Sequence, residues 1–496
     1  MGSHRLLGRC CDHVRPQLWA SSRQPSRLFA LKLHGSRGFR TSSTSYLRNG
    51  ASDDPEDYFE HSFTKRAHGG LASAKVVNAQ PKVKSHLPGA VPQAAPFSEQ
   101  AKGLADGFGF LFDCDGVLYA GNHKIDSAKA ALSLCRHQRA RYLFLTNGGG
   151  NTTEDQKAAS LVKKVGLDDQ ELVHGRVIQS HTPLSTFKEG VKRDEAIYIT
   201  SLDPGRARDI AHAYGFNKVV TADDILEQYE HIYPFHPKRF ANGSVEPFPD
   251  SARIWRGRAP MKYDEAELKG GNYLKIDHVF VFNDPRDWSL ETQIIYDLLI
   301  SHKGYLGTMS RQNGNSALEN DGWQQDGQPT VWVSNLDLLW KTEHPINRFG
   351  TGAFVHAFRG VWHEATGREL QFKYMGKPSQ ITYEYAHECL LREDASSSPG
   401  QNGAVAGRPL RRVYMIGDNP ESDVRGALEF KPEDGTEYVP ILVKTGVWHE
   451  TEPGAQPRWQ PAVIVDDVLD AVVWAMREEG IDIDRKTAEQ HIQRGA

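Results

Sequence analysis

An apolar run that stops at two carboxylates, one residue apart, is the feature that most constrains the fold of this chain. Residues 108–112 are almost entirely aromatic or aliphatic, and such a short run favours a buried parallel strand. Gly116 supplies a turn directly afterwards, so Asp113 and Asp115 lie at the carboxyl end of the predicted strand. In an open, doubly wound sheet this edge is where ligands bind, which makes both carboxylates candidate functional groups.

Three further polar motifs follow along the chain. Thr146 and Asn147 come directly after the largely apolar segment 141–145, and residues 417–423, with the sequence GDNPESD, come directly after the segment 413–416. Between them lies the sequence GKPS at residues 376–379. Each motif alone is a weak signal, because solvated aspartates and lysines are common in turns, but all four in order are specific.

This ordered set resembles the four motifs of the haloacid dehalogenase (HAD) superfamily, over roughly residues 105–475. The resemblance implies an α/β fold with a doubly wound, Rossmann-like parallel-sheet core. It also implies a hydrolase that acts on phosphate esters and uses Mg²⁺ as its cofactor.

More than two hundred residues separate Thr146 from Lys377, which is too many for one loop in a compact domain. Within this gap, residues 196–200 and 278–282 have the composition of strands, and each precedes a predicted helix, over 205–213 and 290–301. We therefore expect an inserted α/β cap.

A cap of this kind, placed between the second and third motifs, is similar to that of the C2-capped class IIA branch. Residues 282–288, residues 348–354 and the basic N-terminus are most similar to the mitochondrial group named after the cat eye syndrome critical region protein. One departure is Leu336, where related phosphatases usually carry proline.

The first fifty residues carry nine lysines and arginines and a single acid, Asp12. This composition, without a long apolar core, is typical of a mitochondrial presequence, although a disordered basic arm has a similar composition. The rest of the chain is acidic, which argues against a nucleic-acid partner, and no apolar run has the length of a membrane span.

The expected organisation has six parts. They are a presequence over 1–45, a flexible lead-in over 46–100, the first part of the HAD core over 101–181, the C2-type cap over 182–331, the second part of the core over 332–480, and a C-terminal tail over 481–496. Residues 331–333 are expected to return the chain to the main sheet. Residues 234–272 and 307–329 are expected to be surface insertions of the cap, and residues 394–408 an unstructured spacer.

The residue types at the four motifs suit phosphoryl transfer. Asp113 can attack phosphorus to form an aspartyl-phosphate, and Asp115 can protonate the leaving oxygen and later take a proton from water. Carboxylates facing a phosphate dianion require a cation, and Mg²⁺ prefers oxygen ligands. Asp113, the main-chain carbonyl of Asp115, Asp418 and Asp423 are the expected metal site.

The expected phosphate ligands are Lys377, which supplies a positive charge, and Thr146, whose hydroxyl donates a hydrogen bond. Asn147 is expected to bind substrate beside them. In the cap, Asp284 and Arg286 follow a predicted strand and are expected to bind an anionic or hydroxylated part of the substrate. The alternative for Arg286 is a surface ion pair with a neighbouring aspartate.

These features predict a Mg²⁺-dependent phosphomonoesterase of the mitochondrial matrix. Its expected partner is a small phosphorylated metabolite, such as a glycerol phosphate or a phospholipid-related compound, and a homodimer through the cap is a further expectation. One alternative is a catalytically silent scaffold with the same fold, against which the intact motifs argue. Another is a glycosyltransferase that holds a nucleotide-sugar metal with the two aspartates, which leaves Lys377 and the fourth motif unexplained.

Overall fold

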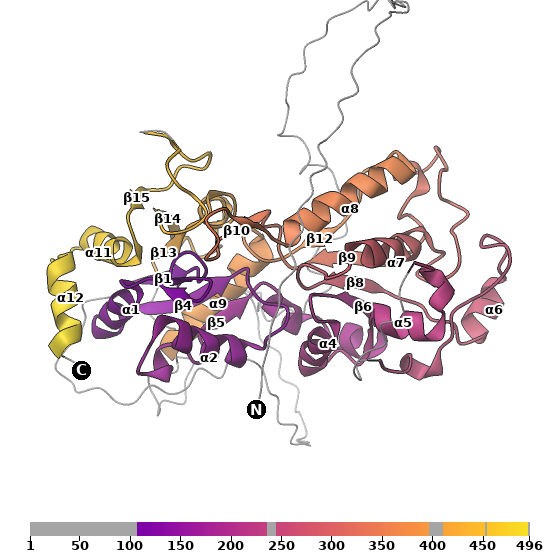
Figure 1. Cartoon of the computed structure of the whole chain (residues 1–496), viewed down its shortest axis with the longest axis horizontal. Helices are drawn as coiled ribbons and strands as arrows, with labels where there is room; N and C mark the ends of the chain where they lie inside the picture. Colours follow the sequence, from indigo (N-terminus) through magenta and orange to yellow (C-terminus); the bar gives the residue numbers. More distant parts are fainter. Residues whose placement is uncertain (1–106, 236–244, 396–409, 452–453, 495–496) are drawn as a thin grey trace, which may run out of the picture. The chain divides into compact units, whose positions relative to one another are not determined.

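The computed structural model describes residues 107–235, 245–395, 410–451 and 454–494. The expected presequence and lead-in lie outside the described residues, as does all but the beginning of the expected spacer. Two parallel sheets, each flanked by helices, make up the described fold, and Figure 1 labels their elements. This confirms the predicted α/β class.

The core sheet has six parallel strands in the order β15-β14-β13-β1-β4-β5. Its strands come from two distant stretches of the chain, which Figure 1 shows side by side in indigo and yellow-orange. The strands are β1 (Phe108–Phe112), β4 (Arg141–Thr146), β5 (Val177–Gln179), β13 (Arg412–Gly417), β14 (Glu437–Val443) and β15 (Val463–Val465).

Alternation along β1 divides the hydrophobic core between the two faces of this sheet. Phe110 and Phe112 lie on the face that packs against α1, α2, α11 and α12, whereas Leu111 lies with side chains of α9 and α10 on the other face. The helices are α1 (Ala128–His137), α2 (Glu154–Val165), α9 (Gln380–Ala395), α10 (Arg425–Glu429), α11 (Val468–Glu478) and α12 (Arg485–Arg494).

Residues 481–494 do not form a tail, contrary to the sequence-based expectation. Ile481, Ile483 and Ala488 are buried in the core cluster, and α12 contacts both α1 and α11. The sequence of α12 is mostly polar, which is typical of a solvent-exposed segment. Its few apolar residues therefore did not predict packing against the core.

The cap sheet has five parallel strands in the order β12-β9-β8-β6-β7. Its strands are β6 (Ala196–Thr200), β7 (Lys218–Val220), β8 (His278–Val281), β9 (Thr330–Val333) and β12 (Lys373–Tyr374). Its helices are α3 (Glu189–Asp194), α4 (Pro204–Ala213), α5 (Ala222–Gln228), α6 (Glu265–Gly270), α7 (Trp288–Ile300) and α8 (Thr351–Thr366).

The expectation that residues 331–333 return the chain to the main sheet is wrong. Strand β9 pairs with β8 and β12 inside the cap sheet, so this sheet continues beyond residue 331 to Tyr374. Phe354, Phe358 and Trp362 of α8 pack in the same hydrophobic cluster as α7. A short apolar strand has the same composition in either sheet, so composition alone could not assign it.

Part of the expected surface insertions has a small core of its own. Trp255, Tyr263, Leu268 and Tyr305 form a buried cluster, joined by hydrogen bonds between residues 253–274 and 304–306. The spacing of these aromatic residues is irregular, which is why the sequence showed no periodicity there.

Two short antiparallel hairpins complete the description: β2 (Tyr119–Ala120) with β3 (His123–Lys124), and β10 (Leu339–Trp340) with β11 (Arg348–Phe349). Within the described residues, no helix combines the length and apolar character that a membrane crossing requires.

Candidate active site

Asp113 lies directly after the central strand β1 of the core sheet. Its backbone N–H donates to the carbonyl of Ile416, which continues the pairing with β13, and its Oδ1 accepts a hydrogen bond from Cys114 N at 2.7 Å. Gly116 follows with φ of +86°, and a β-carbon there would lie 2.2 Å from Asp418 Oδ2. Only glycine lets the turn pass so close to the second carboxylate.

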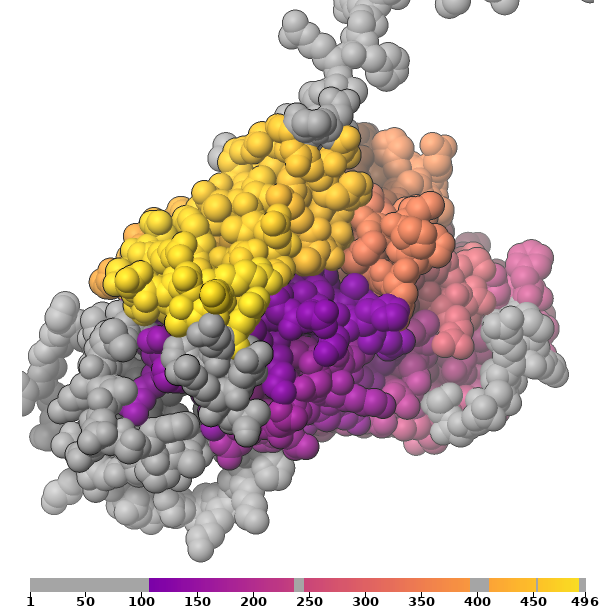
Figure 2. Space-filling model, turned by 60° about the vertical axis from the view of Figure 1, so that its left-hand side comes forward, coloured from indigo at the N-terminus to yellow at the C-terminus, as the bar shows by residue number. Residues whose placement is uncertain are grey.

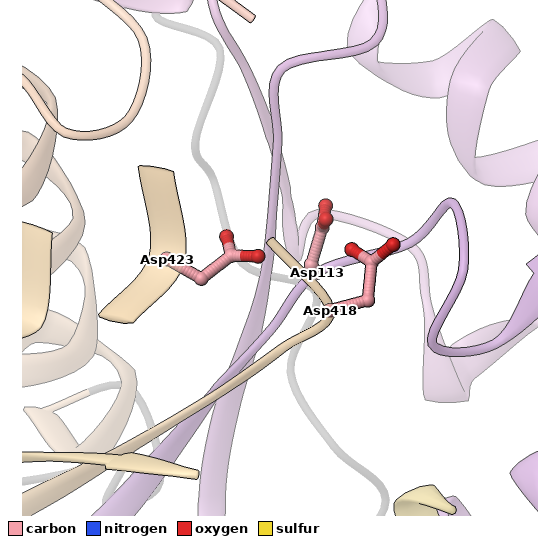
Figure 3. A group of neighbouring side chains, drawn as sticks. All are labelled: Asp113, Asp418 and Asp423. Atoms are coloured by element: carbon pink, nitrogen blue, oxygen red, sulfur yellow. The ribbon is translucent and has the colours of Figure 1, made fainter. Parts of the chain in front are cut away.

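Asp113, Asp418 and Asp423 form a buried group in which one carboxylate oxygen from each residue lies within 4.8 Å of the other two (Figure 3). Asp418 follows β13, and its Oδ2 accepts a hydrogen bond of 2.6 Å from Val447 N. Asp423 belongs to a π-helical turn over residues 420–424, and its Oδ2 accepts from Asn419 N at 3.0 Å. Together with the bond from Cys114 N to Asp113, main-chain donors therefore hold all three carboxylates.

Lys377 lies between two of these carboxylates. Its Nζ is 2.8 Å from Asp113 Oδ1 and 2.7 Å from Asp423 Oδ1, as ion pairs without hydrogen-bond alignment. Burial disfavours the ammonium, but the two carboxylates outweigh burial and hold the pKa of Lys377 well above its usual value. The pKa of Asp113 is raised to about 6, because burial outweighs the opposing effect of Lys377.

The cluster carries more negative charge than Lys377 can balance. Burial and the other aspartates raise the pKa of Asp418 well above its usual value. Burial also raises the pKa of Asp423. Among the described residues, Lys377 is the one cation that forms an ion pair with any of the three carboxylates, and it pairs with Asp113 and Asp423. An oxygen-rich, buried site with excess negative charge suits a hard divalent cation, so these residues fit Mg²⁺.

Asn147 holds Lys377 in place instead of facing a ligand. Its Oδ1 accepts from Lys377 N at 2.7 Å, and its Nδ2 donates to Lys377 O and to Asp337 Oδ2, each at 2.9 Å. These three bonds occupy both amide protons and one side of the carbonyl oxygen. The expectation that Asn147 binds substrate therefore changes to a positioning function.

The Cα of Gly148, in the loop after β4, lies close to three polar side chains: Thr146, Asp115 and Lys157. A β-carbon at Gly148 would lie 3.3 Å from Thr146 Oγ1 and 3.2 Å from both Asp115 Oδ2 and Lys157 Nζ. Lys157 Nζ is 3.5 Å from Asp115 Oδ2 and donates to the hydroxyl of Tyr119, which donates to Asp115 in turn. The sequence analysis missed Lys157, which lies inside helix α2 with no motif around it.

Asp337 is a second residue that the sequence analysis did not assign to the site. It follows β9, and its carboxylate accepts hydrogen bonds from Asn147 and, at 3.4 Å, from Asn419. Burial raises its pKa to about 6, against the opposing charge of Lys377. Its position in the polar turn that follows β9, four residues after Val333, was the available signal.

Known proteins match both halves of the core and the cap between them. Residues 110–217 match the haloacid dehalogenase-like hydrolase family, and residues 374–471 match a family described as HAD-hydrolase-like. The chain is 33% identical over 376 residues to Mitochondrial hydrolase YKR070W of Saccharomyces cerevisiae, covering 73% of this chain and 94% of that protein. The chain belongs to the haloacid dehalogenase-like hydrolase family.

Further similar proteins include a Cardiolipin synthase (CMP-forming) / mitochondrial hydrolase fusion protein of Schizosaccharomyces pombe, 28% identical over 74% of this chain and 53% of the fusion. Among solved structures, glycerol phosphate phosphatase Rv1692 of Mycobacterium tuberculosis is 17% identical, with a TM-score of 0.42 over 74% of this chain and 76% of that chain. NagD of E. coli K-12 is 15% identical, with a TM-score of 0.41 over 77% and 99%.

In this HAD hydrolase the cap loop 283–288 contacts the loop that follows β4. Asn283 Nδ2 donates to Gly149 O at 2.9 Å, and its Oδ1 accepts from Ser201 Oγ. Asp284 accepts a hydrogen bond from the Trp288 indole. Arg286 is exposed, and the described residues offer it no ion pair, neither with Asp284 nor with Asp287.

A separate cavity lies in the cap. It measures about 580 Å³ and is lined at the amino ends of the cap strands by residues such as Lys218, Asp250 and Asp277. We place the site of this HAD hydrolase at the carboxylates because they supply reactive groups, whereas the lysines and acids around the cavity are largely paired with one another.

Proposed function

We propose that the protein is a Mg²⁺-dependent phosphomonoesterase that works through an aspartyl-phosphate. The observation that carries this proposal is the buried arrangement of Asp113, Lys377, Asp418 and Asp423 at the carboxyl ends of β1 and β13. It offers a nucleophile, a fixed cation and an oxygen-rich metal site within a few ångströms.

In the first step Asp113 attacks phosphorus, the ester P–O bond breaks, and Asp115 gives its proton to the leaving oxygen. In the second step water attacks the phosphoryl group, Asp115 takes a proton from this water, and the Asp113 carboxylate leaves. Lys377 and the Thr146 hydroxyl offset the charge on the phosphoryl oxygens. Mg²⁺ would be held by Asp113, Asp418, Asp423 and the carbonyl of Asp115, and it supplies charge neutralisation when bound.

The electrostatics of the site favour this assignment. Lys377 opposes the effect of burial on Asp113, so a pKa of about 6 leaves the nucleophile mostly ionised at neutral pH. Tyr119 donates a hydrogen bond to the Asp115 carboxylate, and Lys157 lies at ion-pair distance from the same oxygen. A catalytically silent scaffold would have no need for this convergence of charged groups, whose burial is costly.

The substrate we propose is a small phosphorylated metabolite of glycerol phosphate or phospholipid type, in the mitochondrial matrix. Support comes from the two relatives whose names contain mitochondrial hydrolase, one of them fused to a cardiolipin synthase. Asp284 and Arg286 are the proposed ligands for its polar part, and a homodimer through the cap remains a prediction.

A panel of phosphate esters, assayed with and without Mg²⁺, tests the proposed function. We expect hydrolysis only with Mg²⁺, and we expect Asp113→Asn to lower turnover by on the order of 10³ or more, because it removes the attacking carboxylate but keeps its shape. Circular dichroism checks that the variant folds. Activity retained by folded Asp113→Asn would exclude Asp113 as nucleophile, and inactivity of the unaltered protein on every ester would favour the scaffold.

A further inference from the structure

The β10–β11 hairpin, which we define as residues 338–349, concentrates exposed apolar side chains. Ile346 is 68% exposed, Phe349 64%, Leu338 45% and Trp340 41%. These are four of the nine large hydrophobic residues that are exposed among the described residues, and they occur within one short segment. Such a concentration of apolar surface marks an interaction site.

The hairpin also carries cations that are not balanced by carboxylates. Lys341 and Arg348 form no ion pair within the described part of the chain, and Arg348 Nη1 instead lies 3.3 Å from His344 Nδ1. The acid of the hairpin, Glu343, faces the β2–β3 hairpin, where its Oε1 accepts from Asn122 N at 2.5 Å. The outward charge of the β10–β11 hairpin is therefore positive.

The hairpin is fixed to the framework of the catalytic edge. Trp340 Nε1 donates to Phe349 O at 3.1 Å across its two strands. Asn347 Nδ2 donates to Val447 O at 3.1 Å, and the N–H of Val447 is the group that holds Asp418. Figure 2 shows the coral surface of this region beside the indigo β2–β3 segment. The hairpin is thus joined to the segment that holds Asp418.

We propose that the β10–β11 hairpin docks the protein on an anionic lipid surface. Trp and Phe favour the boundary between headgroups and acyl chains, aliphatic side chains insert beside them, and Lys and Arg bind the lipid phosphates. A second copy of the chain fits less well, because a symmetric contact would bring Lys341 and Arg348 of two hairpins together without a free carboxylate between them.

Docking in this way holds the catalytic edge close to the lipid headgroups. If the proposed phosphatase function is correct, this selects phosphate monoesters presented in a membrane over the same groups free in solution. The docking itself does not depend on catalysis, so it can be tested whether or not the protein is a phosphatase.

Co-sedimentation of the full chain with vesicles tests the proposal. One vesicle set contains phosphatidylcholine alone and the other also contains phosphatidylglycerol. We expect Ile346→Ser/Phe349→Ser to weaken binding to the anionic vesicles by about tenfold or more, since it removes the two most exposed apolar side chains of the hairpin. Lys341→Gln/Arg348→Gln should weaken binding to the same vesicles and reduce its sensitivity to salt.

The matched control is Leu318→Ser/Val361→Ser, which removes exposed apolar side chains elsewhere. It should bind vesicles as the unaltered chain does. Because the basic N-terminus is present in every variant, equal binding by hairpin and control variants would overturn the proposal and assign binding to another segment. Absence of binding by the unaltered chain would overturn it as well.

Two further measurements separate the remaining outcomes. Hydrolysis of soluble p-nitrophenyl phosphate and circular dichroism should be unchanged in the hairpin variants, which shows that they fold. Sedimentation velocity without lipid should give the same oligomeric state for all variants. Conversion of a dimer to a monomer by Ile346→Ser/Phe349→Ser would show that a second copy covers the hairpin, and the lipid proposal would be wrong.

Discussion

Two lysines near the carboxylates of the proposed active site differ in their surroundings. The side chain of Lys377 is fully buried and forms ion pairs with Asp113 and Asp423. Lys157 retains 14% exposure of its side chain and lies between Asp115 and the Tyr119 hydroxyl. We infer that Lys157 orients Asp115 toward the leaving oxygen, so its effect should depend on how much protonation the leaving group needs.

Lys157→Met tests this dependence. We expect kcat/KM for an alkyl phosphate to fall by roughly ten- to a hundredfold, because a misplaced Asp115 protonates the alkoxide poorly. Hydrolysis of p-nitrophenyl phosphate should fall much less, since nitrophenolate leaves without a proton. Lys164→Met, on the same helix and over the Tyr119 ring, is the matched control. Equal losses with both esters would show that Lys157 has only a structural function.

Secondary-structure elements differ in how well their sequence predicts the sheet to which they belong and their function. Strands β1, β4 and β13 are apolar runs that end at polar motifs, so both their existence and their function could be predicted. Strands β9 and β12 pair inside the cap, and nothing in their composition distinguishes the two sheets. Lys157 could not be found because only tertiary packing brings α2 to Asp115.

A buried acid links strand β6 to helix α7 in the cap. Tyr198 donates a hydrogen bond of 2.5 Å to Glu291, and burial raises the pKa of Glu291 from 4.5 to about 7. The folded state therefore binds this proton more tightly than the unfolded state. The resulting stabilisation is complete below pH 4.5 and is lost as the pH rises through about 7.

Glu291→Gln should remove this pH dependence because glutamine is neutral and still accepts from Tyr198. At pH 8 the free energy of unfolding of the variant should be higher than that of the unaltered protein, by on the order of 3 kcal/mol at most. This difference should become smaller as the pH falls toward 4.5. Urea unfolding at a series of pH values measures it. A difference that stays constant with pH would mean that Glu291 does not titrate in this range.

The loop after β8 carries the prediction on specificity. Arg286 is exposed and has no ion pair among the described residues, while Asn283 holds the same loop against the loop that follows β4. Arg286→Ala should raise KM for an anionic native substrate by roughly tenfold and leave p-nitrophenyl phosphate hydrolysis nearly unchanged. Arg193→Ala, also on the cap, is the control. A similar change with both substrates would exclude Arg286 from substrate selection.

At the scale of the whole molecule, the excess of buried negative charge couples metal binding to stability. Folding brings Asp113, Asp418 and Asp423 together with one lysine, and unfolding separates them. A cation that binds only the folded state raises its stability in proportion to the logarithm of its concentration. The protein without metal should therefore be less stable than its size would allow.

Mg²⁺ should raise the melting temperature of the unaltered protein. Asp418→Asn should abolish most of this shift, yet raise the melting temperature in the absence of metal, because it removes one of the mutually repelling carboxylates. Asp297→Asn, which alters an acid outside the cluster, should retain the Mg²⁺ shift. Calorimetry with EDTA and with Mg²⁺ provides the comparison, and an unchanged shift in Asp418→Asn would refute the proposed metal site.

Because the strands of the core sheet come from two distant stretches of chain, the ribosome completes the cap before it completes the core sheet. Phe110 pairs with Tyr414, and at about 5–20 residues per second β13 emerges roughly 15–60 s after β1. Throughout this interval one edge of an aromatic strand has no partner, while the contiguous cap strands can already close. Nascent chains released after residue 374 but before residue 410 should therefore be captured by chaperones or aggregate, even though all five cap strands are present.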